Sequence, residues 1–261
     1  MRKIEGMSIL ITGGGSGIGA GAARYFSELG AKVTICGRRE ENLMKVSKEI
    51  GPNCFGIRGD VSIAKQRAKV LDSAVRHGNG LDVLINCAAN MLRGSISDLK
   101  EDELMKIFHT NVVSGMMLTG ESIPHLKKSQ GSIIFLGSVH TRRAFPGASP
   151  YAATKGALEA LTNVLAAELG QYKIRVNCVI PGAVPTELNI RAGLFTKDEH
   201  DERMNAISPL HVLGRVGTSE EIAEVMDYLI RAEWTTGASM VVDGGLSLGM
   251  SPFYKLLQNF E

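Results

Sequence analysis

A tyrosine and a lysine stand four residues apart in the stretch YAATK, as Tyr151 and Lys155. If this stretch is helical, both side chains share one face and can point at one site. A free phenol ionises only near pH 10, which is too high for efficient proton transfer near neutrality. An ammonium beside it stabilises the phenolate, by at most about 4 kcal/mol at about 4 Å and an effective dielectric of about 20. The pair therefore suits acid–base chemistry, although the same spacing is common on ordinary helix faces.

Further polar residues stand where neighbouring strands should end. Ser138 closes the apolar run SIIFLGS, thirteen residues before the tyrosine, and the next helix should begin near Pro150. The carboxyl ends of parallel strands meet at one edge, so the serine hydroxyl would face the same crevice and could donate to a substrate carbonyl oxygen. Asn86 and Asp60 end two other expected strands at this edge. Asn111 interrupts an apolar helical stretch, and amides are poor helix formers, so its presence there suggests a functional role. The alternative is a buried amide that only hydrogen-bonds to the backbone.

Short β-rich runs alternate with helical patterns along the chain. We expect strands over 7–12, 31–36, 54–60, 81–86, 132–137, 173–180 and 239–244, and helices over 17–29, 40–50, 64–78, 101–127, 150–170 and 219–231. This alternation predicts an α/β fold, a doubly wound parallel sheet of about seven strands with helices on both faces. With no repeat or linker, 1–261 is interpreted as a single domain. The irregular segment 183–218 is expected to be a flap over a pocket, or else an ordinary surface excursion.

A glycine-rich loop, ITGGGSGIGA, joins the first strand to the first helix. Glycine is needed where φ is positive and where the backbone approaches a ligand closely. Gly13, Gly17 and Gly19, with Ser16 and Ile18 between them, would bring the free N–H groups of the helix N-terminus against a pyrophosphate. The spacing departs from the usual Gly-x-Gly-x2-Gly fingerprint, but the strand before and the helix after favour a dinucleotide site.

The end of the second strand indicates which dinucleotide is bound. An acid there would bind free ribose hydroxyls, whereas a cation would bind a 2′-phosphate. In TICGRREE, Gly37 takes the place of the acid, and Arg38 and Arg39 follow it. Arginine can hold a phosphate through two charge-assisted hydrogen bonds. The sequence therefore favours NADP(H), with NAD(H) as the alternative. The two arginines could also be a solvated basic pair at the start of a charged helix, with no role in cofactor binding.

Bulk composition excludes several function classes. A net charge of +2 gives no basis for a nucleic acid or an anionic membrane as partner. The four cysteines lie far apart without a CxxC pair, and three of them lie in apolar runs, which indicates buried thiols and neither disulfides nor a metal site. No signal peptide or membrane span is evident, so we expect a cytoplasmic protein in a reducing compartment.

Several motifs, in this order, resemble the classical short-chain dehydrogenase/reductase family over about residues 6–250. The matching pieces are TGGGSGIG, DV at 60–61, NCAA at 86–89, NVVSG at 111–115, Ser138, YAATK, PGAVPT at 181–186 and VDGG at 242–245. The resemblance implies a Rossmann-type fold and a catalytic tetrad of Asn111, Ser138, Tyr151 and Lys155. It also implies that the lysine binds the nicotinamide ribose, while Asn111 holds a water of a proton relay.

The same resemblance implies contacts between the chain and the cofactor. Asp60 and Val61 would contact the adenine, and Asn86 the region near the adenine ribose. The family's nicotinamide contacts fall on the stretch Pro181, Gly182, Val184 and Thr186. Three positions depart from the family pattern: Cys87 and Ala89 replace a usual asparagine and glycine, and Ser16 stands where NADP-type members often carry a basic residue.

The function these features predict is NADP(H)-dependent hydride transfer between the cofactor and a small-molecule carbonyl or secondary alcohol. An NAD-linked alcohol dehydrogenase and a non-catalytic dinucleotide-binding scaffold are the alternatives. A homotetramer is expected by family analogy through 101–127, 150–170 and the terminal stretch SPFYKLLQNFE. The substrate is not readable from the sequence; His140, the pair Arg142 and Arg143, and the stretch Met91–Leu92–Arg93 are pocket candidates only.

Overall fold

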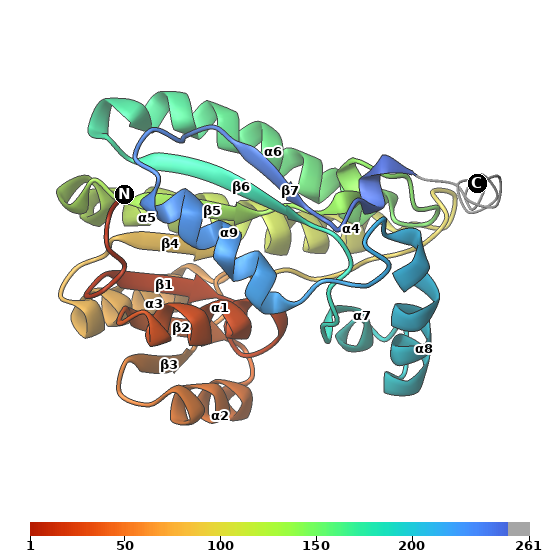
Figure 1. The fold of residues 1–261 in the computed structure, drawn as a ribbon, viewed down its shortest axis with the longest axis horizontal. Coiled ribbons are helices and arrows are strands. Elements are labelled where there is room, and N and C mark those ends of the chain that lie inside the picture. The colour runs from red at the N-terminus through yellow and green to blue at the C-terminus, as the bar shows by residue number, and fades with distance from the viewer. Residues whose placement is uncertain (250–261) are drawn as a thin grey trace, which may run out of the picture.

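The computed structural model describes residues 1–249 of the chain (Figure 1). The strands are β1 (Ser8–Thr12), β2 (Lys32–Gly37), β3 (Cys54–Arg58), β4 (Val83–Asn86), β5 (Ser132–Leu136), β6 (Arg175–Pro181) and β7 (Ser239–Val242). The principal helices are α1 (Gly17–Glu28), α2 (Glu40–Ile50), α3 (Ala64–Gly78), α4 (Glu101–Phe108), α5 (Ser114–Ser129), α6 (Ser149–Leu169), α7 (Leu188–Arg191), α8 (Lys197–Ile207) and α9 (Ser219–Arg231). Each expected strand is found, with bounds within two residues of those predicted.

These strands form one parallel sheet in the order β3-β2-β1-β4-β5-β6-β7. The predicted doubly wound, Rossmann-type sheet of seven strands is therefore confirmed. The order reverses between β1 and β4, because β2 and β3 lie on one side of β1 and the later strands lie on the other. Ligands of open parallel sheets bind outside the carboxyl ends of the strands at such a reversal.

Alternating side chains of the strands feed two separate apolar cores, one on each face. Ile9 and Ile11 of β1 pack with α1, α2 and α9, whereas Leu10 packs with α3, α5 and α6. Figure 1 shows α1 and α9 side by side in front of the sheet. Because both faces are covered, most residues in the central strands are apolar, which is why their runs are readable in the sequence.

The helix expected over 101–127 is divided in the structure. A turn of π-helix, His109–Val113, separates α4 from α5. Asn111 lies in this turn and is buried. Such a turn inserts a residue into the helix and is frequent at functional sites, and here it re-aims one amide toward the loop after β4.

The irregular segment 183–218 carries the short helix α7 and the longer helix α8. Figure 1 places both beyond the carboxyl ends of the strands, apart from the two helical layers. Among residues 1–249, none of the helices combines the length and apolarity that a membrane span requires. The stretch SPFYKLLQNFE lies outside the described residues.

Candidate active site

A cavity follows the carboxyl edge of the sheet, from the glycine loop to α6 and the segment 183–218. Its wall brings together most residues predicted to bind the cofactor or the substrate. These are Gly13, Ser16, Gly17, Ile18, Arg38, Asp60, Val61, Ser138, Tyr151, Lys155, Pro181, Gly182, Val184 and Thr186. Four other predicted residues, Gly19, Arg39, Asn86 and Asn111, are not part of this wall.

The glycine loop has the open backbone that a dinucleotide requires. Gly13 and Gly17 adopt positive φ angles of 69° and 54°. A Cβ on Gly17 would lie 3.0 Å from the side chain of Thr186, and one on Gly19 would lie 2.5 Å from the carbonyl oxygen of Gly13. Gly19 therefore serves close packing, whereas the other two shape the cavity wall. The first turn of α1 contains no acidic residue, so its free N–H groups can bind a phosphate.

The hydroxyl of Thr12 joins the glycine loop to the loop after β4. Its Oγ1 accepts hydrogen bonds from the backbone N–H groups of Cys87 and Ala88, both at 3.0 Å. Sequence reasoning missed this contact, because its partners are more than seventy residues away. Ala89, where the family has glycine, does not have a positive φ, so this backbone tolerates a side chain.

Cations gather where β2 ends. The exposed Arg38 donates to the Asn90 side chain at 3.2 Å, while Arg39 pairs with Glu187 at 2.7 Å. Arg191 of α7 also lines the cavity and donates to the carbonyl of Ala89 at 3.2 Å. Burial, then the positive charges of Arg39 and Arg38, lower the pKa of Arg191, so the other two arginines disfavour its charged form. Sequence reasoning missed Arg191, because no motif surrounds it.

The lysine and tyrosine of YAATK lie on the first turns of α6, on the face toward the sheet. Lys155 is 2% exposed, and its ammonium donates to the carbonyl oxygen of Leu136 at 2.6 Å. Its Nζ is 5.5 Å from the centre of the Tyr151 ring. The hydrogen bond to the last residue of β5 satisfies the buried cation and holds it beside the phenol at the sheet edge.

The two asparagines occupy buried positions behind the cavity wall. Asn111 accepts from the backbone N–H of Asn90 at 2.7 Å and donates to its carbonyl at 2.9 Å and to the hydroxyl of Thr154 at 3.1 Å. Its amide therefore ties the loop after β4 to α6 at the residue preceding the lysine. Asn86 donates instead to Thr119 on α5 at 3.3 Å.

Two polar side chains, Arg93 and His140, form a hydrogen-bonded chain that ends at Ser138. Arg93 Nη2 lies 3.4 Å from His140 Nε2, and His140 Nδ1 lies 3.0 Å from Ser138 Oγ. A guanidinium can only donate, so Nε2 accepts and the proton sits on Nδ1, which donates to the serine oxygen. The serine's own hydrogen is thereby left to donate elsewhere. Burial, then the charges of Arg93, Arg203 and Lys155, lower the pKa of His140 to about 4.

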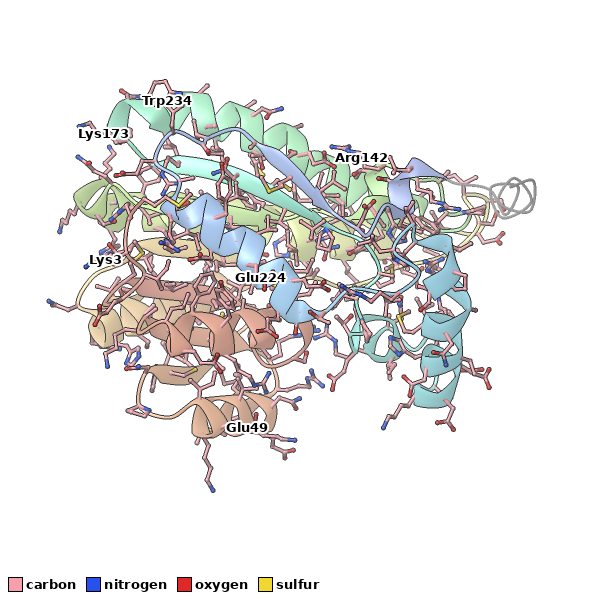
Figure 2. The ribbon with its side chains drawn as sticks, viewed as in Figure 1. Lys3, Glu49, Arg142, Lys173, Glu224 and Trp234 are labelled. Atoms are coloured by element: carbon pink, nitrogen blue, oxygen red, sulfur yellow. The ribbon has the colours of Figure 1, made fainter. Side chains whose placement is uncertain are left out.

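Other candidates from the sequence are engaged elsewhere. Arg142 pairs with Glu159 of α6 and Arg143 donates to the carbonyl of Leu246 at 2.8 Å; neither lines the cavity. Figure 2 shows Arg142 on the α6 side of the molecule. The cysteines are unpaired, three of them buried, and burial raises the pKa of Cys36 to about 12. Within residues 1–249, no cluster of potential metal ligands was found.

The geometry and the comparisons with known proteins agree on the family. A family model described as enoyl-(acyl carrier protein) reductase matches residues 13–247. An uncharacterised oxidoreductase of Methylorubrum extorquens is 34% identical over 94% of this chain and all of its own. The chain belongs to the short-chain dehydrogenase/reductase family, and it is an NAD(P)-dependent oxidoreductase.

Solved structures give the same result. A short-chain dehydrogenase/reductase of unknown function from Caenorhabditis elegans, solved with cofactor, has a TM-score of 0.89 at 28% identity and covers 96% of this chain and 98% of its own. A 3-ketoacyl-(acyl-carrier-protein) reductase from Brucella melitensis, complexed with NADH, has a TM-score of 0.83 at 29% identity, with coverages of 94% and 99%. A nicotinamide dinucleotide is therefore the cofactor class.

Replacement of His140 should change how stability depends on pH. The unfolded chain protonates this histidine near pH 6.5, whereas the folded protein resists protonation down to about pH 4. The unfolded state thus binds more protons in this window, so His140 destabilises the fold as the pH falls through it. As the pH falls through this window, the free energy of unfolding of His140→Asn should decrease less than that of the wild type. The difference is at most about 1.4 kcal/mol per pH unit. Urea unfolding of both proteins at several pH values measures the difference, and parallel curves would contradict the assignment.

Proposed function

We propose that this protein is an NADP(H)-dependent oxidoreductase that transfers hydride between the cofactor and a small carbonyl compound or secondary alcohol, with Tyr151 as general acid and base. The observation that carries the proposal is the convergence of Ser138, Tyr151 and Lys155 on one cavity wall opposite the glycine loop. When bound, the nicotinamide dinucleotide supplies or accepts the hydride. The fit of the cavity to it is supported by the positive φ angles of Gly13 and Gly17 and by their close approach to neighbouring loops.

Each side chain has one task in this proposal. Ser138 donates its free hydrogen to the substrate oxygen and fixes its position. Tyr151 delivers a proton to that oxygen in reduction and removes it in oxidation. Lys155 would stabilise the phenolate and hold the nicotinamide ribose. Asn111, whose amide holds Asn90 and α6, is a positioning residue for the lysine and a member of the family's proton relay.

The preference for NADP(H) rests on the charge at the end of β2. Gly37 lines the cavity and carries no acid, although a Cβ there would meet its nearest neighbour, Leu43, only at 3.8 Å. Arg38 and Arg191 line the cavity, and Arg39, outside its wall, donates to the Ser16 hydroxyl at 3.1 Å and is offset by Glu187. Such a cluster favours a 2′-phosphate over free ribose hydroxyls. Asp60 and Val61 line the wall farther along, where the adenine is proposed to lie.

The remaining proposed contacts close the cavity from the other side. Pro181, Gly182, Val184 and Thr186 follow β6 and face the nicotinamide in this proposal, and the segment 183–218 acts as the flap over the substrate within one domain. Its Leu188, Met204, Ile207 and Leu210 line the cavity. This apolar lining favours a substrate with a hydrocarbon portion.

Removal of the phenolic hydroxyl should abolish turnover. We expect Tyr151→Phe to lower kcat at least about a hundredfold, because the general acid is lost. NADPH binding, measured by fluorescence titration, should stay close to that of the wild type. The assay follows nicotinamide absorbance over a panel of ketones, secondary alcohols and enoyl thioesters. Full activity of the variant would refute the tyrosine role; a wild type that binds NADPH but converts no member of the panel would favour the scaffold alternative.

Charge changes beside the ribose should shift the cofactor preference. Arg38→Ala should weaken NADPH binding while sparing NADH, because one phosphate ligand is lost. Gly37→Asp should lower the preference for NADPH over NADH further, by about tenfold to a hundredfold in the ratio of the two dissociation constants. A carboxylate repels the 2′-phosphate and can bind the free hydroxyls. Gly37→Asn is the control of equal size without the charge. Dissociation constants of both cofactors measure the effect, and an unchanged NADPH/NADH ratio in Arg38→Ala and Gly37→Asp would contradict the NADP(H) assignment.

We also propose a homotetramer, assembled through the faces of α4, α5 and α6. Exposed apolar side chains gather there, including Met105 at 63%, Met117 at 48% and Val164 at 54% exposed. The neutral, unpaired cysteines support a reducing, cytoplasmic location.

Light scattering should give a mass near four times that of one chain. Met117→Lys should reduce this mass, because a charge in an apolar interface has no partner. The exposed Met44→Lys on α2, outside this face, is the control and should leave the mass unchanged. A wild type that scatters as a single chain would overturn the tetramer.

A further inference from the structure

Two arginines line the part of the cavity that also contains Ser138 and Tyr151. Arg93 comes from the loop after β4 and Arg203 comes from α8. Neither forms an ion pair with any residue that the structure describes, whereas Arg39 at the ribose end pairs with Glu187. The cavity wall therefore carries two uncompensated cations beside the proposed reaction centre.

Arg93 is only partly satisfied by the protein. Its Nη2 reaches His140, but its Nε is buried and has no hydrogen-bond partner among residues 1–249. Burial, then the charge of Arg203, lower the pKa of Arg93. Buried donors are normally paired, and a buried charge without an anion is costly. The Nε atom is itself closed off, but the guanidinium to which it belongs lines the cavity without an ion pair, so an anion in the cavity would meet an uncompensated cation.

No carboxylate of the wall is available to supply that acceptor. The acidic residues that line the cavity in the described part of the chain are Asp60, at the end of β3, and Glu187, which is paired with Arg39. Arg203 has its guanidinium carbon 5.1 Å from the ring of Phe195, a contact that positions the cation without neutralising it. His140, the titratable group between the arginines and the serine, is neutral above its lowered pKa of about 4.

We propose that the natural substrate carries an oxyanion, a carboxylate or phosphate, which Arg93 and Arg203 bind while its carbonyl oxygen lies at Ser138 and Tyr151. This inference rests on the proposed function and names its substrate class: a short oxo acid or oxo phosphate, or the corresponding hydroxy compound. Only one imidazole ring separates Arg93 from the serine, so the anion lies a few bonds from the reacting carbon. Reduction adds one hydride from the cofactor to carbon and one proton through Tyr151 to oxygen; the anionic group is unchanged.

Matched pairs of charged and neutral ketones test the proposal. The probes are acetoacetate and levulinate against their methyl esters, and dihydroxyacetone phosphate against dihydroxyacetone. Two readouts are taken on the full chain: kcat/KM with NADPH, and calorimetric binding to the protein saturated with NADP⁺. The variants are Arg203→Gln and Arg93→Gln. The control is Arg58→Gln, an exposed arginine outside the cavity wall, and all variants are first checked for wild-type NADP⁺ binding.

The wild type is expected to have a higher kcat/KM for one charged class than for its neutral counterpart. Arg203→Gln should reduce the ratio of these two kcat/KM values by about tenfold to a hundredfold. Arg58→Gln should leave it unchanged. Which class is favoured, oxo acid or oxo phosphate, identifies the oxyanion. Equal use of charged and neutral probes, ratios that the arginine variants do not change, or no binding of any charged probe would overturn the inference. Charged probes that bind through the arginines but are not reduced would retain the anion site and refute the proposed function.

Discussion

The buried ammonium of Lys155 is the constraint on which the rest of the site depends. A cation that is 2% exposed needs a strong acceptor, and the carbonyl of Leu136 at the end of β5 provides it at 2.6 Å. This bond fixes the start of α6 against the edge of the sheet. Tyr151, one turn earlier, and Ser138, two residues beyond β5, then face the same cavity. The relative positions of these three side chains are therefore set by one helix and one strand end.

The cavity has a cationic cluster at each end, and the two clusters differ in how they are compensated. Near the end of β2, Arg39 is offset by Glu187, and the exposed Arg38 donates one hydrogen bond to Asn90. Near Ser138, Arg93 and Arg203 form no ion pair with the described residues, and His140, which contacts the serine, has a pKa lowered to about 4. We therefore propose that one end binds the phosphate of a dinucleotide and the other a small anionic ligand.

The fold was predictable because each central strand is covered on both faces and therefore has an unbroken apolar run of at least three residues, as in β1, β4 and β5. The position of Tyr151, Lys155 and Ser138 on one cavity wall was predictable because each is placed by its own strand end or helix start. Thr12, Arg191 and the bond between His140 and Ser138 were not predicted. Their roles depend on contacts between distant segments or on a side-chain orientation that no local spacing encodes. The hydrogen bonds between the Asn111 side chain and the backbone of Asn90 were missed for a similar reason, since the two residues lie 21 positions apart.

The proposed role of Tyr151 as general acid and base depends most on the ammonium of Lys155. The pH dependence of alcohol oxidation at saturating cofactor, compared between the wild type and Lys155→Met, tests it most directly. The account predicts that the variant is slower by at least about a hundredfold near neutrality and recovers as the pH approaches about 10, where a phenol ionises without assistance. A variant whose profile parallels that of the wild type over this whole range would contradict it.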